Sequence, residues 1–194
     1  LLDKAVRHGE VADLCMKTLP YTRLMVGEAQ DWASSLGGLK NSITGGRGNA
    51  AGRLGELALA KHLGVKLADE KDYDMVYNGE KIEVKTKRRT VPPQGFYDVS
   101  VAKTSQHQRP DRYVFISMEF EDSGYYGKPA QGLTRRGGKW YKNLKDVWLC
   151  GDMSAKEFFQ RAKLWQEGTT DESNDFTTLT TMYNLSVDEL HETF

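Results

Sequence analysis

Apolar and polar positions along the chain recur with two periods, one typical of helices and one typical of strands. Helical spacing predicts three helices in the first third of the chain, over 2–18, 22–36 and 50–63. Pro20 ends the first of them, and Gly64 stands at the usual C-terminal position of the third. The stretch between the second and third helices, GGLKNSITGGRGNAAG, is rich in glycine and has no acidic residue, which predicts a loop.

The middle and the end of the chain predict mainly strands. The pair Asn78-Gly79 favours a two-residue type I′ hairpin turn. The predicted strands are 73–77, 80–86, 96–102, 112–118 and 146–150. The polar stretch 121–143 resembles a hairpin insertion. This order predicts a mixed α/β or α+β domain.

Two further helices are predicted near the C-terminus. One covers 155–166, with Ser154 as its N-cap and Glu157 completing a capping box. A short one covers 186–191. The Ser/Thr/Asp-rich stretch TTDESNDFTTLTT between them predicts loose structure.

Length and composition fit one globular domain with small additions. The chain has 194 residues, 39% apolar and 28% charged, which is enough to bury a core without disulfides. The apolar runs are too short to cross a membrane, no signal peptide opens the chain, and the two cysteines lack motif spacing. We therefore expect a cytoplasmic protein with no membrane partner. The pattern divides it into N-terminal helices with a Gly-rich loop (1–49), a core domain (50–165) and an acidic C-terminal tail with a short helix (166–194).

The formal net charge is zero, but the charges are unevenly distributed. Residues 166–194 hold seven acidic residues and no lysine or arginine, which leaves 27 basic and 20 acidic residues in the rest of the chain. The body is therefore basic, with a net charge of +7, and the tail is acidic. Such an asymmetry favours a nucleic-acid partner, although solubility alone would also account for it.

The hairpin YDMVYNGEKIEVKTKRR, residues 73–89, carries charges within its strands. Strand residues alternate between faces, so Glu83 and Lys85 share one face and their apolar neighbours point to the core. With a two-residue turn, Asp74 is predicted to face Glu83, and two facing carboxylates repel. An exposed sheet face with a salt bridge is one interpretation. A divalent-metal site is the other, because Mg²⁺ often takes one or two protein carboxylates and completes its shell with water and phosphate. The backbone carbonyl of Val84 would add an oxygen, and Lys85 would position the attacking water or offset charge at phosphorus.

This pattern of an aspartate, a hairpin and Glu-x-Lys resembles the PD-(D/E)XK nuclease superfamily, which has the restriction-endonuclease-like fold. Asp74 matches the aspartate of the motif, and Glu83-Val84-Lys85 match its (D/E)-x-K. The helical stretch RLGELA, which contains Glu56, is similar to a helix that carries a glutamate before the hairpin in many members. The order of elements over roughly 50–118 and the strand-then-helix stretch WLCGDMSAKEFFQRA are similar to the family core. The chain departs from the motif at Tyr73, where a proline often stands.

The resemblance implies a fold class and a metal site. The fold is α/β (mixed α+β), with a restriction-endonuclease-like core over 50–165, a central mixed sheet of four to five strands flanked by helices, and extra N-terminal helices. The implied catalytic residues are Asp74, Glu83, Lys85 and Glu56. The implied ligands of Mg²⁺, for which Mn²⁺ can substitute, are Asp74, Glu83, the carbonyl of Val84, and Glu56. Without the resemblance, Glu56 is better explained as a solvated residue at the edge of its helix's apolar face.

Basic residues near the motif are predicted to contact a phosphate backbone. They are Lys87, Arg88 and Arg89, with Arg47, Arg53, Arg135, Arg136 and Lys139 as weaker candidates on loops. A solvated charge run is the ordinary explanation of such a triplet. In related nucleases a polar residue after the third strand supports the site, which points to Gln106.

We therefore predict a Mg²⁺-dependent DNA endonuclease that hydrolyses phosphodiester bonds in double-stranded or branched DNA. The alternatives within this fold are a DNA exonuclease, a junction resolvase, or a catalytically weak DNA-binding or regulatory module. An interaction protein whose acidic tail covers the basic face as a phosphate mimic is a further alternative. A homodimer joined by the extra helices or the tail also fits this size.

Overall fold

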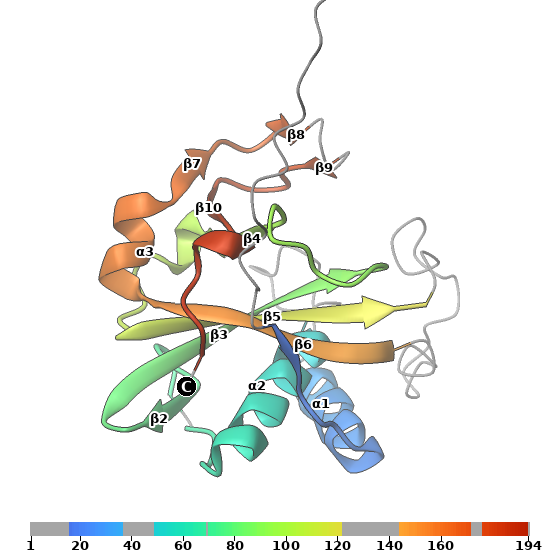
Figure 1. Cartoon of the computed structure of the whole chain (residues 1–194). Helices are drawn as coiled ribbons and strands as arrows, with labels where there is room; N and C mark the ends of the chain where they lie inside the picture. The colour runs from blue at the N-terminus through green and yellow to red at the C-terminus, as the bar shows by residue number, and fades with distance from the viewer. Residues whose placement is uncertain (1–15, 37–48, 69, 122–143, 172–175, 194) are drawn as a thin grey trace, which may run out of the picture.

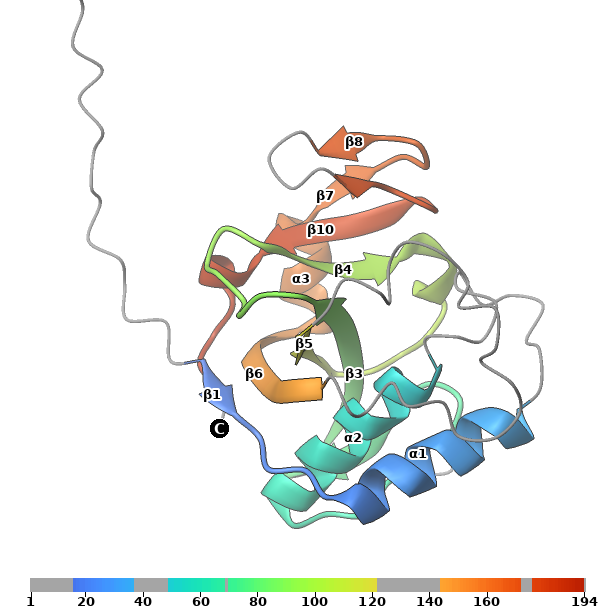
Figure 2. The same cartoon turned by 90° about the vertical axis from the view of Figure 1, so that its right-hand side faces the viewer.

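The computed structural model describes residues 16–36, 49–68, 70–121, 144–171 and 176–193. These residues form three layers (Figures 1 and 2). A five-stranded mixed sheet lies in the middle, with two helices on one face and a smaller sheet and a third helix on the other. The fold class is therefore mixed α/β, as the sequence predicts.

The central sheet has the strand order β1-β6-β5-β3-β2. Its strands are β1 (Lys17–Thr18), β6 (Leu144–Ser154), β5 (Arg112–Phe120), β3 (Glu80–Arg89) and β2 (Met75–Tyr77). The pair β3–β5 is parallel, and the other neighbours are antiparallel.

The hairpin of β2 and β3 forms as predicted. Asn78 and Gly79 both have positive φ, 49° and 84°, as a type I′ turn requires. The predicted register is confirmed, because Tyr77 pairs with Glu80 and Met75 pairs with Ile82.

Helices α1 (Arg23–Ser35) and α2 (Asn49–Leu63) cover one face of this sheet. Both match predicted helices, and Thr22 caps α1 by accepting a hydrogen bond from the backbone N–H of Met25 at 3.3 Å. Leu54, Ala58 and Leu59 of α2 are fully buried in the core between these helices and the sheet. Gly55 brings α2 against β3: a Cβ at this position would lie 2.4 Å from Thr86 Oγ1. The close approach needs glycine, and it fixes where the next residue, Glu56, stands relative to the hairpin.

The opposite face of the central sheet carries a second sheet of order β4-β10-β7 and helix α3 (Ala155–Arg161). The strands are β4 (Asp98–Ala102), β10 (Met182–Ser186) and β7 (Lys163–Trp165), and a two-stranded ribbon of β8 (Thr170–Asp171) and β9 (Phe176–Thr177) adjoins them in sequence. A second core forms between these layers around Tyr113, Phe115 and Phe158. Ser154 caps α3 through the backbone N–H of Glu157 at 3.2 Å, as predicted.

The structure corrects five predicted elements. The strand predicted over 96–102 forms as β4 but does not join the central sheet; it pairs with β10, because β5 occupies the free edge of β3. The helix predicted over 155–166 ends at Arg161, where the chain turns extended to pair β7 with β10. The stretch 169–181 contains β8 and β9, and the predicted C-terminal helix is a single 3₁₀ turn, Val187–Glu189, capped by Ser186.

The helix predicted over 2–18 is the fifth case. Lys17 and Thr18 are strand β1, paired with the edge of β6, and residues 2–15 lie outside the described residues. Most of the predicted insertion, 122–143, also lies outside them. The division into parts at 1–49, 50–165 and 166–194 stays a prediction.

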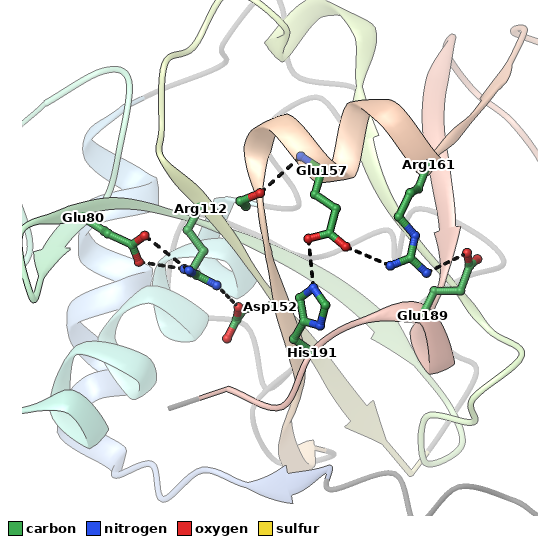
Figure 3. Close-up of polar contacts among 8 residues, drawn as sticks. Glu80, Arg112, Asp152, Glu157, Arg161, Glu189 and His191 are labelled. Atoms are coloured by element: carbon green, nitrogen blue, oxygen red, sulfur yellow. Dashed lines mark hydrogen bonds and ion pairs between the residues drawn. The ribbon is translucent and has the colours of Figure 1, made fainter.

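Charged contacts join the C-terminal residues to the rest of the fold (Figure 3). His191 Nε2 lies 2.9 Å from Glu157 on α3, and Arg161 reaches Glu157 at 3.0 Å and Glu189 at 3.2 Å. Backbone hydrogen bonds in both directions join His191 to Asp152 of β6. The acidic C-terminal segment is thus held against the domain from 182 onward.

A second set of contacts in Figure 3 links three strands. Arg112 donates to Glu80 at 2.8 Å, and it also donates to the buried carboxylate of Asp152. The start of β5 is thereby joined to the turn end of β3 and to β6. Among the described residues, no helix is both long and apolar enough to span a membrane.

Candidate active site

The pairing of β2 with β3 stops just before Asp74, and the candidate site lies at this end of the hairpin. The β2–β3 ladder ends at Met75 and Ile82, one pair before the position at which Asp74 was predicted to face Glu83. Asp74 instead donates its N–H to the carbonyl of Ile82 at 2.8 Å, and its Oδ2 accepts from the backbone N–H of Val84 at 2.7 Å. The Asp74 side chain therefore replaces a partner strand at this point on the edge of β3.

Backbone geometry places the Val84 carbonyl on the same side as Asp74. In a strand, the N–H and C=O of one residue point to the same edge. The N–H of Val84 points to Asp74, so its carbonyl also points to this edge. Beyond Ile82, no described strand pairs with β3 on that side. The open edge therefore offers backbone oxygen next to a carboxylate.

Glu83 and Lys85 lie on the face of β3 that is turned to the second sheet, as their alternation predicts. Lys85 Nζ donates to Glu83 Oε1 at 2.7 Å and to Gln108 Oε1 at 3.2 Å. Gln108 Nε2 in turn donates to Glu83 Oε1 at 3.1 Å and to the carbonyl of Lys71 at 3.2 Å. These four contacts fix the orientation of the Glu83 carboxylate and the Lys85 ammonium group.

Sequence reasoning missed Gln108 and chose Gln106. Gln106 is exposed, and its Oε1 accepts a hydrogen bond of 3.4 Å from the hydroxyl of Tyr183. Both glutamines stand in the same irregular stretch, Q106-H-Q108, whose course no periodicity predicts. Gln108, two positions further on, contacts both Lys85 and Glu83.

Glu56 reaches the same edge from α2. Its Oε2 accepts from Arg53 at 3.0 Å, and Arg53 lies 5.0 Å over the ring of Trp32. Burial raises the pKa of Glu56, against the opposing effect of Arg53, and repulsion from Glu83 adds to the rise. The carboxylates from helix and strand are therefore close enough to repel.

Asp74 has the most strongly shifted carboxyl group at the site. Burial, together with repulsion from Glu56 and Glu83, raises the pKa of Asp74 to about 8, against the hydrogen bond from Val84 and the charge of Lys85. Three carboxylates and one lysine thus interact electrostatically at one edge of the hairpin. Shifts of this kind, caused by burial and like charges together, are frequent at functional sites.

The donor set fits a hard divalent cation in part. No group of three His, Cys, Asp or Glu side chains within the described residues is arranged to hold a metal ion by itself. Mg²⁺ does not need three, because it often takes one or two carboxylates and keeps water or phosphate oxygens. Asp74, Glu83 and the Val84 carbonyl offer such oxygens, and a cation would relieve the repulsion that raises the pKa of Asp74. The residues therefore fit Mg²⁺ as ligands that need substrate or solvent to complete the shell.

A buried hydroxyl adjoins this cluster. Tyr113 is fully buried, its Oη has no hydrogen-bond partner among the described residues, and its ring lies 5.9 Å from Lys85 Nζ. Burial raises the pKa of Tyr113 to about 12, and Glu83 adds to the rise. The hydroxyl thus stays protonated as a donor within this part of the site.

The basic triplet after the motif is less exposed than a solvated charge run. Lys87 Nζ and Arg89 Nη2 each donate to the carbonyl of Asp98 on β4 at 2.9 Å, and Arg89 lies 4.4 Å over the ring of Tyr97. Arg88 is half-buried on the other face. Two of the three side chains therefore point between the sheets. Arg47, Arg135, Arg136 and Lys139 lie outside the described residues.

Comparisons with known proteins add no relative. No protein-family model matches the chain, and neither a curated protein nor a solved structure does.

Proposed function

We propose that this protein is a Mg²⁺-dependent nuclease that hydrolyses phosphodiester bonds in DNA, of the PD-(D/E)XK type. One observation carries the proposal: Asp74, Glu83, Lys85 and Glu56, the residues that match the motif, interact at the open edge of one hairpin. These residues come from separate parts of the chain. A salt bridge on an exposed sheet face would need only Glu83 and Lys85, and not a glutamate from α2.

The arrangement of the central sheet gives further support. The restriction-endonuclease-like core needs a helix that packs on the hairpin, and α2 does so through Gly55. It also needs further strands beside the motif strand, which β5 and β6 supply. The departure is β4, which leaves the central sheet for β10. This departure leaves in place the elements that carry the motif residues: β3 with Glu83 and Lys85, α2 with Glu56, and the residue before β2, Asp74.

In this proposal Asp74, Glu83 and the Val84 carbonyl hold Mg²⁺, with Glu56 beside them. When bound, the ion supplies the Lewis acidity that polarises a phosphodiester. Lys85 carries three donor hydrogens, and Glu83 and Gln108 take two of them. The third is left to position the attacking water or to stabilise charge on a phosphate oxygen. Gln108 holds the Glu83 carboxylate and the Lys85 ammonium group in position during this step.

A cleavage assay tests the proposal. Supercoiled, linear, single-stranded and branched DNA are incubated with Mg²⁺, Mn²⁺ or chelator, using the parent, Lys85→Ala and Lys81→Ala. Lys81 is an exposed lysine of the same strand and serves as the matched control. We expect metal-dependent cleavage that falls by at least about 10²-fold in Lys85→Ala, the usual scale for a charge-stabilising group, and that Lys81→Ala retains.

Two outcomes contradict the proposal. One is metal-dependent cleavage that persists in folded Lys85→Ala, since the motif lysine would then have no catalytic role. The other is the absence of cleavage on every substrate with either metal. Salt-sensitive DNA binding without cleavage would favour the alternative of a binding or regulatory module.

A further inference from the structure

A cavity of about 310 Å³ lies between the central sheet and the second sheet. Its walls come from β3, β5 and β6 on one side and from β4, β10 and the 3₁₀ turn at Val187 on the other. Lys85 of the candidate active site lines the same cavity. At this volume it stands at the lower end of small-molecule pockets, which occupy roughly 300–1,000 Å³. It therefore suits a ligand the size of one small molecule and not a duplex.

The β3 wall of the cavity is cationic. Lys85, Lys87 and Arg89 stand at every second position of the strand, so all three share the face that lines the cavity. No carboxylate is among the described lining residues. Asp98 and Asp171 lie close enough to Lys87 to act on its charge, while burial and Arg89 lower the pKa of Lys87 to about 8. Lys87 and Arg89 share a neutral acceptor, the carbonyl of Asp98, and the described cavity lining brings no carboxylate to this wall, which favours an anionic ligand.

A buried hydroxyl stands beside the cations. Ser117 pairs in register with Lys87 on the neighbouring strand, is 2% exposed and lines the cavity. Its Oγ has no hydrogen-bond partner among the described residues. Buried hydroxyls are normally hydrogen-bonded, because leaving one unpaired is costly. An acceptor oxygen of a ligand at this wall would give the Ser117 hydroxyl the partner that it lacks.

The rest of the lining is mostly apolar. Val99 of β4, Phe115 of β5 and Val187 contribute to it. A ligand that satisfies both parts needs an anionic group with several acceptor oxygens at one side and a flat or apolar body at the other. A nucleotide has this composition: its phosphate suits Lys87, Arg89 and Ser117, and its base suits the apolar wall.

We propose that this cavity binds a single nucleotide as its 5′-monophosphate. The role we assign to it rests on the proposed function: the cavity takes the nucleotide next to the phosphodiester that is cleaved at Lys85. The nucleotide comes either from the end of a DNA strand or from the free pool, and both present the same phosphate and base.

Calorimetry on the full chain tests this in the presence of chelator, with thymidine 5′-monophosphate as the probe. Thymidine and inorganic phosphate are the two partial ligands. We expect the monophosphate to bind at least tenfold more tightly than either part, and Lys87→Met to weaken its binding at least tenfold. Lys103→Met, an exposed lysine that does not line the cavity, is the control and retains affinity.

A second variant fills the cavity instead of removing charge. Ala102 lines it from β4 and is half-buried, so Ala102→Leu is expected to abolish binding while the thermal unfolding transition is kept. No binding of the monophosphate to the parent overturns the proposal. Equal binding to the parent, Lys87→Met and Ala102→Leu also overturns it, because the ligand would then sit elsewhere.

Competition separates the two sources of the nucleotide. A linear 5′-phosphorylated oligonucleotide that displaces the probe, when circular single-stranded DNA does not, identifies a strand end. Displacement by neither identifies the free nucleotide. Because chelator prevents metal-dependent cleavage, the two proposals fail separately: binding without cleavage refutes the nuclease alone, and cleavage without binding refutes the pocket alone.

Discussion

Glu83 and Val84 are neighbours on β3 and are equally buried, each 7% exposed, but their two faces of the strand are covered in different ways. Val84 packs against the helix layer in an apolar core. Glu83 faces the second sheet, where Lys85 and Gln108 contact its carboxylate. Burial on the first face is favourable by itself, whereas burial of a carboxylate is costly unless charge and hydrogen bonds compensate it. Apolar burial therefore stabilises the Val84 side without help, whereas the Glu83 side depends on its polar contacts, as a site of the proposed kind would.

The largest effect that we expect comes from the ionisation of Asp74. Its pKa is about 8 against an ordinary value of 3.8, so between those pH values the folded state holds a proton that the unfolded state has lost. The free energy of unfolding therefore falls as the pH rises through this window, by up to about 1.4 kcal/mol per pH unit. Asp74→Asn should remove this slope, as measured by urea unfolding in chelator from pH 5 to pH 9.

Asp72→Asn is the control for this series, because Asp72 is an exposed aspartate two positions earlier and its replacement should leave the slope unchanged. Mg²⁺ should flatten the slope of the parent, since a cation favours the ionised carboxylate. At a hundred times its dissociation constant the ion should add about 2.7 kcal/mol, and Asp74→Asn should abolish this gain. An unchanged slope in Asp74→Asn would show that the ionisation of Asp74 does not lower the free energy of unfolding.

The helix face is tested at Gly55. A methyl group there would meet Thr86 Oγ1 at 2.4 Å, so Gly55→Ala should cost about 1–3 kcal/mol as an overpacked contact. The matched control is Gly52→Ala in the same helix, where the added Cβ meets nothing within 4 Å and should stabilise by about 0.5–1 kcal/mol. Thermal unfolding of both variants measures the difference.

The double variant Gly55→Ala/Thr86→Ala sharpens this test, because removing the Thr86 hydroxyl makes room for the added methyl group. It should recover most of the stability that Gly55→Ala loses. If Gly55→Ala were tolerated as well as Gly52→Ala, α2 would not be held at this distance from β3, and the position of Glu56 would lose its physical basis.

Local signals predicted the local features of the fold well. The Asn78-Gly79 turn, the Ser154 cap and α2 follow from short-range rules about φ, capping and helical spacing, and the structure confirms them. Alternation also predicted that Glu83 and Lys85 share a face. What stands behind that face was not predictable, because β10 comes from a distant segment and its pairing with β4 leaves no local signal.

Features that depend on pairing between distant segments were missed for the same reason. The sequence does not indicate that β4 leaves the central sheet, that Lys87 and Arg89 point between two sheets, or that Gln108 and not Gln106 reaches Lys85. The opening of the hairpin at Asp74 was also missed. Strict alternation predicts that the ladder continues to Asp74 and Glu83, whereas the Asp74 side chain takes the place of the partner strand there. The candidate residues were found from the motif, and their contacts came from tertiary structure.

The smallest effect that we predict distinguishes function from stability on the charged face. Lys85→Met leaves the buried Glu83 carboxylate with Gln108 as its remaining side-chain partner, which should cost about 1–2 kcal/mol for a buried group that loses one hydrogen bond. Glu83→Gln should cost a similar amount, because it leaves Lys85 without its counter-charge. The double variant Lys85→Met/Glu83→Gln should cost little more than either single variant, since no unpaired charge remains. Urea unfolding of the four proteins gives this coupling, and the cleavage assay should find all three variants inactive. A double variant that costs no more than one single variant and is inactive would mean that this ion pair is retained for chemistry. Additive costs would mean that Glu83 and Lys85 act independently and that the two faces of β3 differ less than their residues suggest.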